Sequence, residues 1–531
     1  MKLKRLPATL IILAMTAGML PCTVLASESD KVPERNGIIR KVFPEGDSTD
    51  TAGTVTGVTG DIRWSIDEET KTLTISPNNK KTKAAMPDFT YFGAPWSNYY
   101  FVIENVVISG GITNVGSYAF CDCALVKNVK LPSGIKKIGQ SAFSRTGITR
   151  ISIPKTVTVI ERYAFYDCPE LIDITLPNGL KTIGEAAFSD CDELYSVTVP
   201  KTVTSIGSEA FDGCGKLENV EILGPASIGS YAFRNAGSLT ELKLANGVRS
   251  IGNSAFERCN NLTSLTIPGS VASIGDYAFD SCTGLIKLTI QSGVKKIGAF
   301  AFTNCDSLHS LTVPGSVSVI DTGTFSYCTG LVTVNIQRGV TDIRDKAFGN
   351  CTMIENLSLP YGLRSIGIIA FEKNISLTEV TIPSSVTEIG YSAFSACKRL
   401  EKVNISQEML DKTDASAWAG CPADFDLNIL QDNPVKIKGK TVTVRSKALK
   451  KKNQTIPASG AFSVNMKDQE LLFVKVSGNS NITVNSNNGK VTVKKKLKKG
   501  TYKVKVKVMA AGNGNYKASG WKTVTVRIKV K

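Results

Sequence analysis

The sequence predicts a mainly β fold: a solenoid of about fourteen coils of 23 residues, with a β cap before it and a second β domain after it. The first observation is the regular spacing of aromatic residues along the chain. Phenylalanines recur every 23 residues, or 22 before Phe165 and Phe233, and Trp418 follows the last one after 24. A strand-like alternation inside each unit and a basic, strictly alternating stretch after the last unit complete the prediction. The repeated phenylalanines are Phe120, Phe143, Phe165, Phe188, Phe211, Phe233, Phe256, Phe279, Phe302, Phe325, Phe348, Phe371 and Phe394.

Each unit reads L-x-x-L-x-I-P-x-x-V-x-x-I-G-x-x-A-F-x-x-C, and the residue types predict the structure of each part. Leu265 and Ile267 alternate with polar residues, which predicts a short, half-buried strand. Pro268 cannot donate a ladder hydrogen bond and ends that strand. Phe279 and Cys282 fit one face of a single helical turn. One unit cannot bury its apolar face alone, so the coils are expected to stack.

This unit resembles the BspA-like subclass of bacterial leucine-rich repeats over residues 109–430. The resemblance implies a leucine-rich repeat solenoid on a bacterial surface protein. Members of that family include adhesins toward host matrix proteins such as fibronectin and fibrinogen. Adhesion is therefore the expected class of function, and the resemblance leaves the ligand open, because a shared scaffold does not fix what is bound.

Residues 1–26 have the pattern of a secretory signal peptide. Lys2, Lys4 and Arg5 precede an apolar run, and the small residue Ala26 offers a cleavage point. Cys22 leaves a lipoprotein alternative, which the preceding proline disfavours. No later stretch approaches the ~20 apolar residues of a membrane span, so a secreted or cell-surface protein is expected after cleavage.

Residues 27–59, rich in Ser, Thr, Gly and charge, are predicted to form a flexible leader, and residues 60–108 an N-terminal β cap. From Gly60, two alternating runs flank a polar turn, which predicts a hairpin. An aromatic stretch follows. It is expected to seal the first coil, with a carbohydrate or ligand patch as the alternative. Its aromatic residues are Phe89, Tyr91, Phe92, Trp96, Tyr99, Tyr100 and Phe101.

Residues 431–531 are predicted to form a basic, immunoglobulin-like β domain. Residues 435–531 contain 24 Lys and Arg but only Asp468 and Glu470, a net charge of about +22, against +17 for the whole chain. Residues 503–508 and 524–530 alternate strictly between apolar and mostly basic side chains. A domain with this charge should attract anionic cell-wall polymers in a salt-dependent manner. Nucleic acid is not expected, because the domain has few aromatic residues for base stacking.

Eleven cysteines fall three residues after the repeated aromatic residue, a slot that Thr146, Ala236 and Asn374 fill in other coils. We therefore expect small buried side chains there instead of disulfides or zinc ligands. Cys121 breaks the pattern and is the thiol expected to be exposed. His309, the only histidine, is read as a surface residue. The sequence shows no catalytic motif, so no enzyme, cofactor or metal is expected.

The outward-facing position of each repeat strand is the candidate binding face. Ser152, Ser358, Asn335 and Asn404 share this position with the threonines, and Lys130, Glu221 and Lys243 interrupt the row. Threonine also simply suits a strand, which is the structural alternative. The candidate threonines are Thr175, Thr198, Thr266, Thr289, Thr312 and Thr381.

Two functions follow from these features. The first is binding of a host matrix or cell-surface protein or glycan by the repeats, for adhesion. The second is a non-covalently wall-associated scaffold held by the basic domain. The sequence leaves open the ligand, the oligomeric state and whether the protein remains on its cell.

Overall fold

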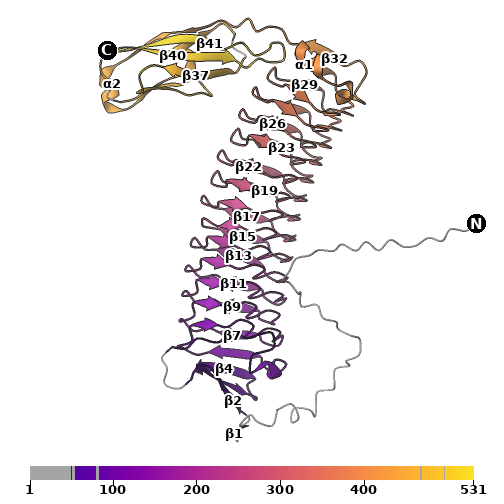
Figure 1. Cartoon of the computed structure of the whole chain (residues 1–531), viewed down its shortest axis with the longest axis vertical. Coiled ribbons are helices and arrows are strands. Elements are labelled where there is room, and N and C mark those ends of the chain that lie inside the picture. The colour runs from indigo at the N-terminus through magenta and orange to yellow at the C-terminus, as the bar shows by residue number, and fades with distance from the viewer. Residues whose placement is uncertain (1–48, 51–53, 79–82, 467–468, 496) are drawn as a thin grey trace, which may run out of the picture. The chain divides into compact units, whose positions relative to one another are not determined.

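Figure 1 shows the computed structural model of the chain, which describes residues 49–50, 54–78, 83–466, 469–495 and 497–531. The described residues all belong to one compact unit, residues 48–531. The predicted signal peptide at residues 1–26 and most of the predicted leader lie outside the described residues. Among the described helices, none has the length and apolar character needed to span a bilayer.

The N-terminal sheet joins an antiparallel cap to the first coils. Its strands, in order, are β1 (Thr49–Asp50), β2 (Thr54–Thr59), β3 (Ile62–Asp67), β4 (Thr72–Pro77), β5 (Asn105–Ile108) and β7 (Asn128–Lys130). β3 and β4 form the predicted hairpin, with Trp64 opposite Ile75. β4 then pairs in parallel with β5, so backbone hydrogen bonds continue from cap to solenoid. β2 lies within the predicted leader, and because Val55 is buried against this sheet, the ordered cap begins before Gly60.

The long strands of the coils stack in chain order and in parallel, as Figure 1 shows. Their hydrogen-bonded ladder has three breaks, between β7 and β9, between β17 and β19, and between β27 and β29. After β5 and β7 these strands are β9 (Arg150–Ser152), β11 (Asp173–Thr175), β13 (Ser196–Val199), β15 (Asn219–Ile222), β17 (Glu241–Leu244), β19 (Ser264–Ile267), β21 (Lys287–Ile290), β23 (Ser310–Val313), β25 (Thr333–Ile336), β27 (Asn356–Ser358), β29 (Glu379–Thr381), β31 (Lys402–Ile405) and β32 (Asp426–Ile429).

A second ladder of two-residue strands runs along another side of the coils, again in parallel. In each of these strands the second residue is buried and apolar, which places the V-x-x-I part of the unit in the core. The strands are β6 (Asn114–Val115), β8 (Lys137–Ile138), β10 (Val159–Ile160), β12 (Thr182–Ile183), β14 (Ser205–Ile206), β16 (Ser227–Ile228), β18 (Ser250–Ile251), β20 (Ser273–Ile274), β22 (Lys296–Ile297), β24 (Val319–Ile320), β26 (Asp342–Ile343), β28 (Ser365–Ile366) and β30 (Glu388–Ile389).

The repeated aromatic rings form one continuous stack inside the solenoid. Neighbouring phenylalanine centroids lie 5.0–5.5 Å apart, with interplanar angles of 1–13°. Trp96 extends the stack before Phe120, and Trp418 extends it after Phe394. The phenylalanines are fully buried, so each coil hides its ring only by stacking on its neighbours.

The chain around each phenylalanine is a left-handed turn and not the predicted helical turn. In the coil of Phe279, Tyr277 has φ 57° and Ser281 has φ 59°, and the same two positions have positive φ in the coil of every repeated phenylalanine. The N–H groups of Tyr277, Phe279 and Ser281 donate to carbonyls of the next coil at 2.8–3.0 Å. These inter-coil hydrogen bonds replace the bonds that a helix would make within itself. The spacing A-F-x-x-C therefore mimics one helical face without forming a helix.

The C-terminal domain follows α1 (Gln407–Lys412) and the 3-10 turn η3 (Ala415–Trp418). β34, β41, β40 and β37 form one sheet, β35, β39 and β38 another, and β33 pairs with β36. Their apolar faces share one core cluster, so the predicted β domain is present, whereas its immunoglobulin-like topology stays a prediction. Its elements are β33 (Ile437–Gly439), β34 (Thr441–Val444), α2 (Ser446–Lys451), β35 (Gln454–Ile456), α3 (Ala458–Ala461), β36 (Phe462–Val464), β37 (Leu471–Ser477), β38 (Ile482–Val484), β39 (Val491–Val493), β40 (Gly500–Ala510) and β41 (Lys522–Val530).

Candidate binding face

The outward-facing side chains of the long strands form a surface that we call the strand face. Five of the six candidate threonines are exposed on it: Thr175, Thr198, Thr266, Thr289 and Thr312. Strand pairing aligns the row, because Thr266 lies opposite Thr289 and Thr312 lies opposite Asn335. The structure thus gathers these residues from successive coils, as the repeat spacing predicted.

The hydroxyls of the exposed threonines on the strand face are available for hydrogen bonds to a partner. The five exposed candidate threonines make no side-chain hydrogen bond with any described residue. Threonines beside the second ladder behave differently. Thr158, Thr204 and Thr387 donate their hydroxyls to backbone carbonyls of the preceding coil, at 3.2–3.4 Å. The same residue type therefore ties coils together on one side and faces solvent on the other.

The row is not continuous. Glu221 and Lys243 occupy the threonine position on β15 and β17, and Lys243 pairs with Glu241 at 2.8 Å. The ladder then breaks between β17 and β19, where Glu241, Lys243, Ser264 and Thr266 line a shallow pocket. The face therefore has separate stretches, the longest threonine run being that on β19, β21 and β23.

Thr381 differs from the other candidates because it is half-buried near the C-terminal domain. Its Oγ1 accepts a hydrogen bond from Asn404 Nδ2 at 3.0 Å. Asn428 Nδ2 donates to the carbonyl of Gly514 at 2.8 Å, and the N–H of Ala518 donates to Ser384 Oγ at 2.9 Å. Hydrogen bonds thus join this end of the strand face to the β40–β41 loop.

A cavity of about 450 Å³, which we call the junction cavity, lies beside these contacts, at the break between β27 and β29. Ser358 and Arg338 line it from the solenoid, and Glu470, Asn513 and Tyr516 line it from the C-terminal domain. No sequence signal could have found this site, because its residues lie far apart in the chain and belong to two different folds.

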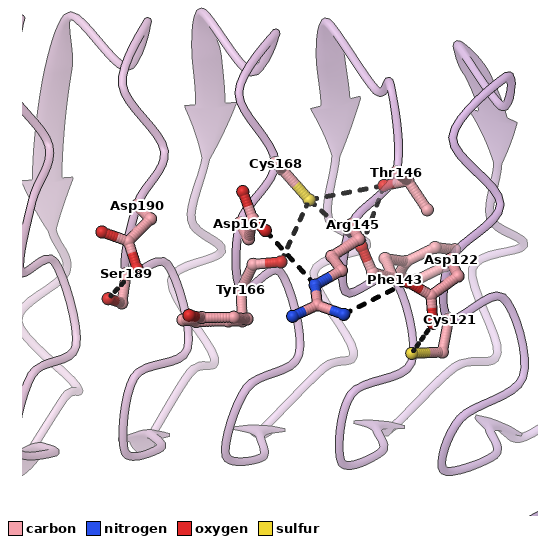
Figure 2. Close-up of polar contacts among 10 residues, drawn as sticks. All are labelled: Cys121, Asp122, Phe143, Arg145, Thr146, Tyr166, Asp167, Cys168, Ser189 and Asp190. Atoms are coloured by element: carbon pink, nitrogen blue, oxygen red, sulfur yellow. Dashed lines mark hydrogen bonds and ion pairs between the residues drawn. The ribbon is translucent and has the colours of Figure 1, made fainter. Parts of the chain in front are cut away.

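The side of the solenoid with the left-handed turns carries charged residues that pair with one another. Figure 2 shows Arg145 between two carboxylates, with Nη1 3.5 Å from Asp122 Oδ1 and Nε 3.3 Å from Asp167 Oδ2. Further along the solenoid, Arg234 pairs with the single carboxylate of Asp212 in the preceding coil. These ion pairs join neighbouring coils, so we assign this side a structural role.

The cysteine slot, three residues after each repeated aromatic residue, holds a small buried side chain that also donates a hydrogen bond. Cys282 Sγ donates to the carbonyl of Phe256 in the preceding coil at 3.3 Å, and most slot cysteines do the same. Asn374 replaces the thiol with Nδ2, 3.0 Å from the carbonyl of Phe348. Burial raises the pKa of Cys282 to about 12. The eleven slot cysteines form no disulfide with any described residue, and the predicted exposure of Cys121 holds only in part, since it is half-buried beside Asp122.

Of the other candidate residues from the sequence, some are buried in the fold and some are exposed on the surface. Trp96 and Tyr99 are buried, and Trp96 Nε1 donates to the carbonyl of Ala119 at 2.7 Å. Tyr91, Phe92, Tyr100 and Phe101, from the same aromatic stretch, are exposed, so only part of this stretch packs on the first coil. His309 is exposed on the surface. Within the described ranges, no group of His, Cys, Asp and Glu is arranged to hold a metal ion.

Comparisons with known proteins found one family profile and several solved structures that are similar to this chain. The sequence profile described as "BspA type Leucine rich repeat region (6 copies)" matches residues 97–218, 226–355 and 341–437. A leucine-rich repeat protein from Bacteroides ovatus is 22% identical, with 71% of this chain and 100% of that chain covered and a TM-score of 0.51. A leucine-rich repeat protein from Eubacterium ventriosum is 24% identical, with 64% and 94% covered and a TM-score of 0.42. A leucine-rich cell surface protein from Faecalibacterium prausnitzii is 25% identical, with the same coverages and a TM-score of 0.33.

No curated protein matches the chain. The profile covers more than half of the chain, and the Bacteroides ovatus structure supports the solenoid fold. Leucine-rich repeat solenoids are typically binding scaffolds, and none of these comparisons indicates an enzymatic family. The chain belongs to the BspA-type leucine-rich repeat family of bacterial surface proteins.

Proposed function

We propose that this chain is a secreted or cell-surface protein that binds a host matrix or cell-surface protein or glycan through its strand face, and so mediates adhesion. Export is directed by residues 1–26, with residues 27–59 as the leader. The main support for this proposal is the row of exposed hydroxyls on Thr266, Thr289 and Thr312, which make no hydrogen bond with any described residue. Exposed hydroxyls at the regular spacing of a parallel sheet offer a partner a series of hydrogen-bond donors and acceptors.

The decisive experiment replaces these three threonines together with arginine in the full chain and measures binding to immobilised fibronectin and fibrinogen. We expect saturable binding by the unmodified chain and at least a tenfold loss in the variant, because three long cations block the face. The matched control carries arginine at Ser205, Ala272 and Ser318, which are exposed on or beside the second ladder and make no side-chain hydrogen bond with any described residue. Equal losses in both triple variants would contradict a role for the strand face.

The basic domain supports a second function, a non-covalent wall anchor. Lys503, Lys505 and Lys507 of β40 are all exposed on one face of the sheet. Lys503 lies directly opposite Arg527 of β41. Like charges opposite one another destabilise a sheet, and an anionic polymer would relieve that repulsion. We propose that this face binds anionic cell-wall polymers while the solenoid binds its partner.

A further inference from the structure

Four aromatic side chains of the N-terminal cap form an exposed cluster, which we call the cap patch: Tyr91, Phe92, Tyr100 and Phe101. Each of them is 39–49% exposed. Their rings contact one another in chain order, with successive centroids 4.2, 6.1 and 5.4 Å apart. The buried Trp96, from the same stretch, already closes the ring stack of the solenoid. The four exposed rings are therefore not needed to seal the core.

Phe92 is exposed and also has an unfavourable backbone conformation. The N–H of Gly93 donates to the carbonyl of Thr90 at 2.8 Å, so Tyr91 and Phe92 are the corner residues of a turn. Phe92 has φ 56° there, a conformation that glycine adopts without strain and that an aromatic residue rarely adopts. The repeated left-handed turns of the coils are held by hydrogen bonds to the next coil, but this turn lies outside the repeats. Strained residues of this kind gather at functional sites.

The surroundings of the cap patch are polar but uncharged. Residues 89–103 contain no Asp, Glu, Lys, Arg or His. Thr90 and Asn98 are exposed, and two of the four rings carry a hydroxyl. Flat apolar faces beside neutral donors and acceptors match a sugar ring, which has apolar C–H faces and a rim of hydroxyls. A charged polymer would lose hydration here and gain no counter-charge from this segment.

The area of the cap patch decides between a small ligand and a second protein. An aromatic side chain can bury roughly 150–250 Å², so the four partly exposed rings offer about 350 Å². A stable protein–protein interface buries about 800 Å² on each partner. The patch is therefore too small to hold a globular partner or a second copy of this chain by itself, whereas an oligosaccharide needs only a few ring faces.

We propose that the cap patch binds a neutral saccharide chain. Its apolar ring faces lie on the exposed aromatic rings, and its hydroxyls bond to Thr90, Asn98 and the tyrosine hydroxyls. The site goes beyond the function proposed above, because it lies in the N-terminal cap and includes no candidate threonine of the strand face. It gives the chain a second ligand, whether or not the strand face binds a protein.

Calorimetric titration of the full chain with neutral hexasaccharides of glucose, galactose, mannose or N-acetylglucosamine tests the proposal. We expect saturable binding of at least one of them. The double change Phe92→Leu and Phe101→Leu keeps apolar side chains but removes two flat rings, so it should weaken that sugar by about tenfold or more. Its urea midpoint should stay close to that of the unmodified chain, because both side chains are half-exposed and remain apolar. Each single change should cause part of the loss.

A galacturonate hexamer should bind more weakly than the neutral sugar, because its carboxylates find no cation among residues 89–103. Tyr391→Leu is the matched control, since it removes a ring that is 63% exposed and lies outside the cap patch, and it should leave sugar binding unchanged. The proposal is overturned if no neutral hexasaccharide binds, if the double variant binds as well as the unmodified chain, if Tyr391→Leu loses as much, or if the galacturonate hexamer binds more tightly.

The two binding sites are distinguishable in the same assays. The triple arginine variant at Thr266, Thr289 and Thr312 should keep sugar binding, and the double leucine variant should keep binding to fibronectin and fibrinogen. Sedimentation velocity adds a further check. A dimer that the double leucine variant dissociates would make the cap patch a contact between copies of the chain and overturn the proposal.

Discussion

The indole of Trp418 stacks on the ring of Phe394, with centroids 5.0 Å apart and 11° between the planes. At the other end, Trp96 lies on Phe120 at 5.9 Å and 21°. Both ends of the phenylalanine stack are thus closed by a larger aromatic ring, each from a segment that departs from the repeat. A terminal phenylalanine would otherwise expose one ring face to water, so these tryptophans act as the apolar ends of the core.

Substitution within the stack should cost more than substitution at its end. Phe279→Ala removes a ring with a neighbour on both sides and should lower the free energy of unfolding by about 3–5 kcal/mol. Trp418→Ala should cost less and loosen mainly the last coils, since Trp418 is only half-buried. Urea unfolding measures the first effect, and limited proteolysis locates the second. Equal costs for both would argue against a stack with distinct ends.

A substitution in the cysteine slot should stabilise the folded protein. Asn374 donates to the carbonyl of Phe348, but its Oδ1 is buried and has no partner among the described residues. Asn374→Cys keeps a donor and removes the unpaired oxygen, so it should raise the free energy of unfolding by about 1–2 kcal/mol. The reverse change in the preceding coil, Cys351→Asn, is the control and should destabilise. Urea midpoints that move in the opposite directions would contradict the donor interpretation.

The period of the repeat was enough to predict the coils, the strand positions and the shared face of Thr266 and Thr289. It could not reveal the left-handed turns, because the residues that adopt them, such as Tyr277, Lys346 and Ile369, have no common chemistry. The repeat also could not predict the ladder breaks. The junction cavity could not be predicted from the sequence either. Arg338 and Tyr516 line one cavity only because tertiary packing brings two folds together, and a local sequence pattern does not encode that packing.

Alkaline pH should unfold the protein through its buried thiols. Burial raises the pKa of both Cys123 and Cys282 to about 12, from an ordinary value of 9.0. Between pH 9 and 12 the folded state therefore holds protons that the unfolded state has lost. The stabilisation is complete below pH 9 and declines as pH rises, by about 1.4 kcal/mol per pH unit for each such thiol.

The measurement is urea unfolding as a function of pH for the unmodified chain and for Cys282→Ala. The difference in slope above pH 9 isolates this thiol, because every other titratable group is present in both proteins. A thiol reagent supplies an independent check, because the fully buried thiols, Cys282 among them, should react only after unfolding. Identical slopes for the two proteins would contradict the assignment.

A lysine in a left-handed turn offers a separate test of the coil geometry. Lys346 is exposed and has φ 60°, a conformation that costs a side-chain-bearing residue roughly 1–2 kcal/mol. Lys346→Gly should raise the free energy of unfolding by about 1 kcal/mol, whereas Lys346→Val should lower it, because a β-branched residue suits this region least. Lys295→Gly, at an exposed site without positive φ, should destabilise and serves as the control.

The lysine face of the C-terminal domain predicts salt-dependent retention on cell walls. The triple change of Lys503, Lys505 and Lys507 to glutamine should abolish most binding of the full chain to isolated Gram-positive walls at low salt. The same three charges can be removed elsewhere, at the exposed Lys447, Lys450 and Lys451, as the control. Because both variants have the same net charge, a loss confined to the first assigns binding to the β40 face, whereas equal losses indicate a general charge effect.

Raising NaCl from about 0.1 M to about 1 M shortens the screening length from about 10 Å to about 3 Å, so wall binding should disappear while strand-face binding to a matrix protein persists.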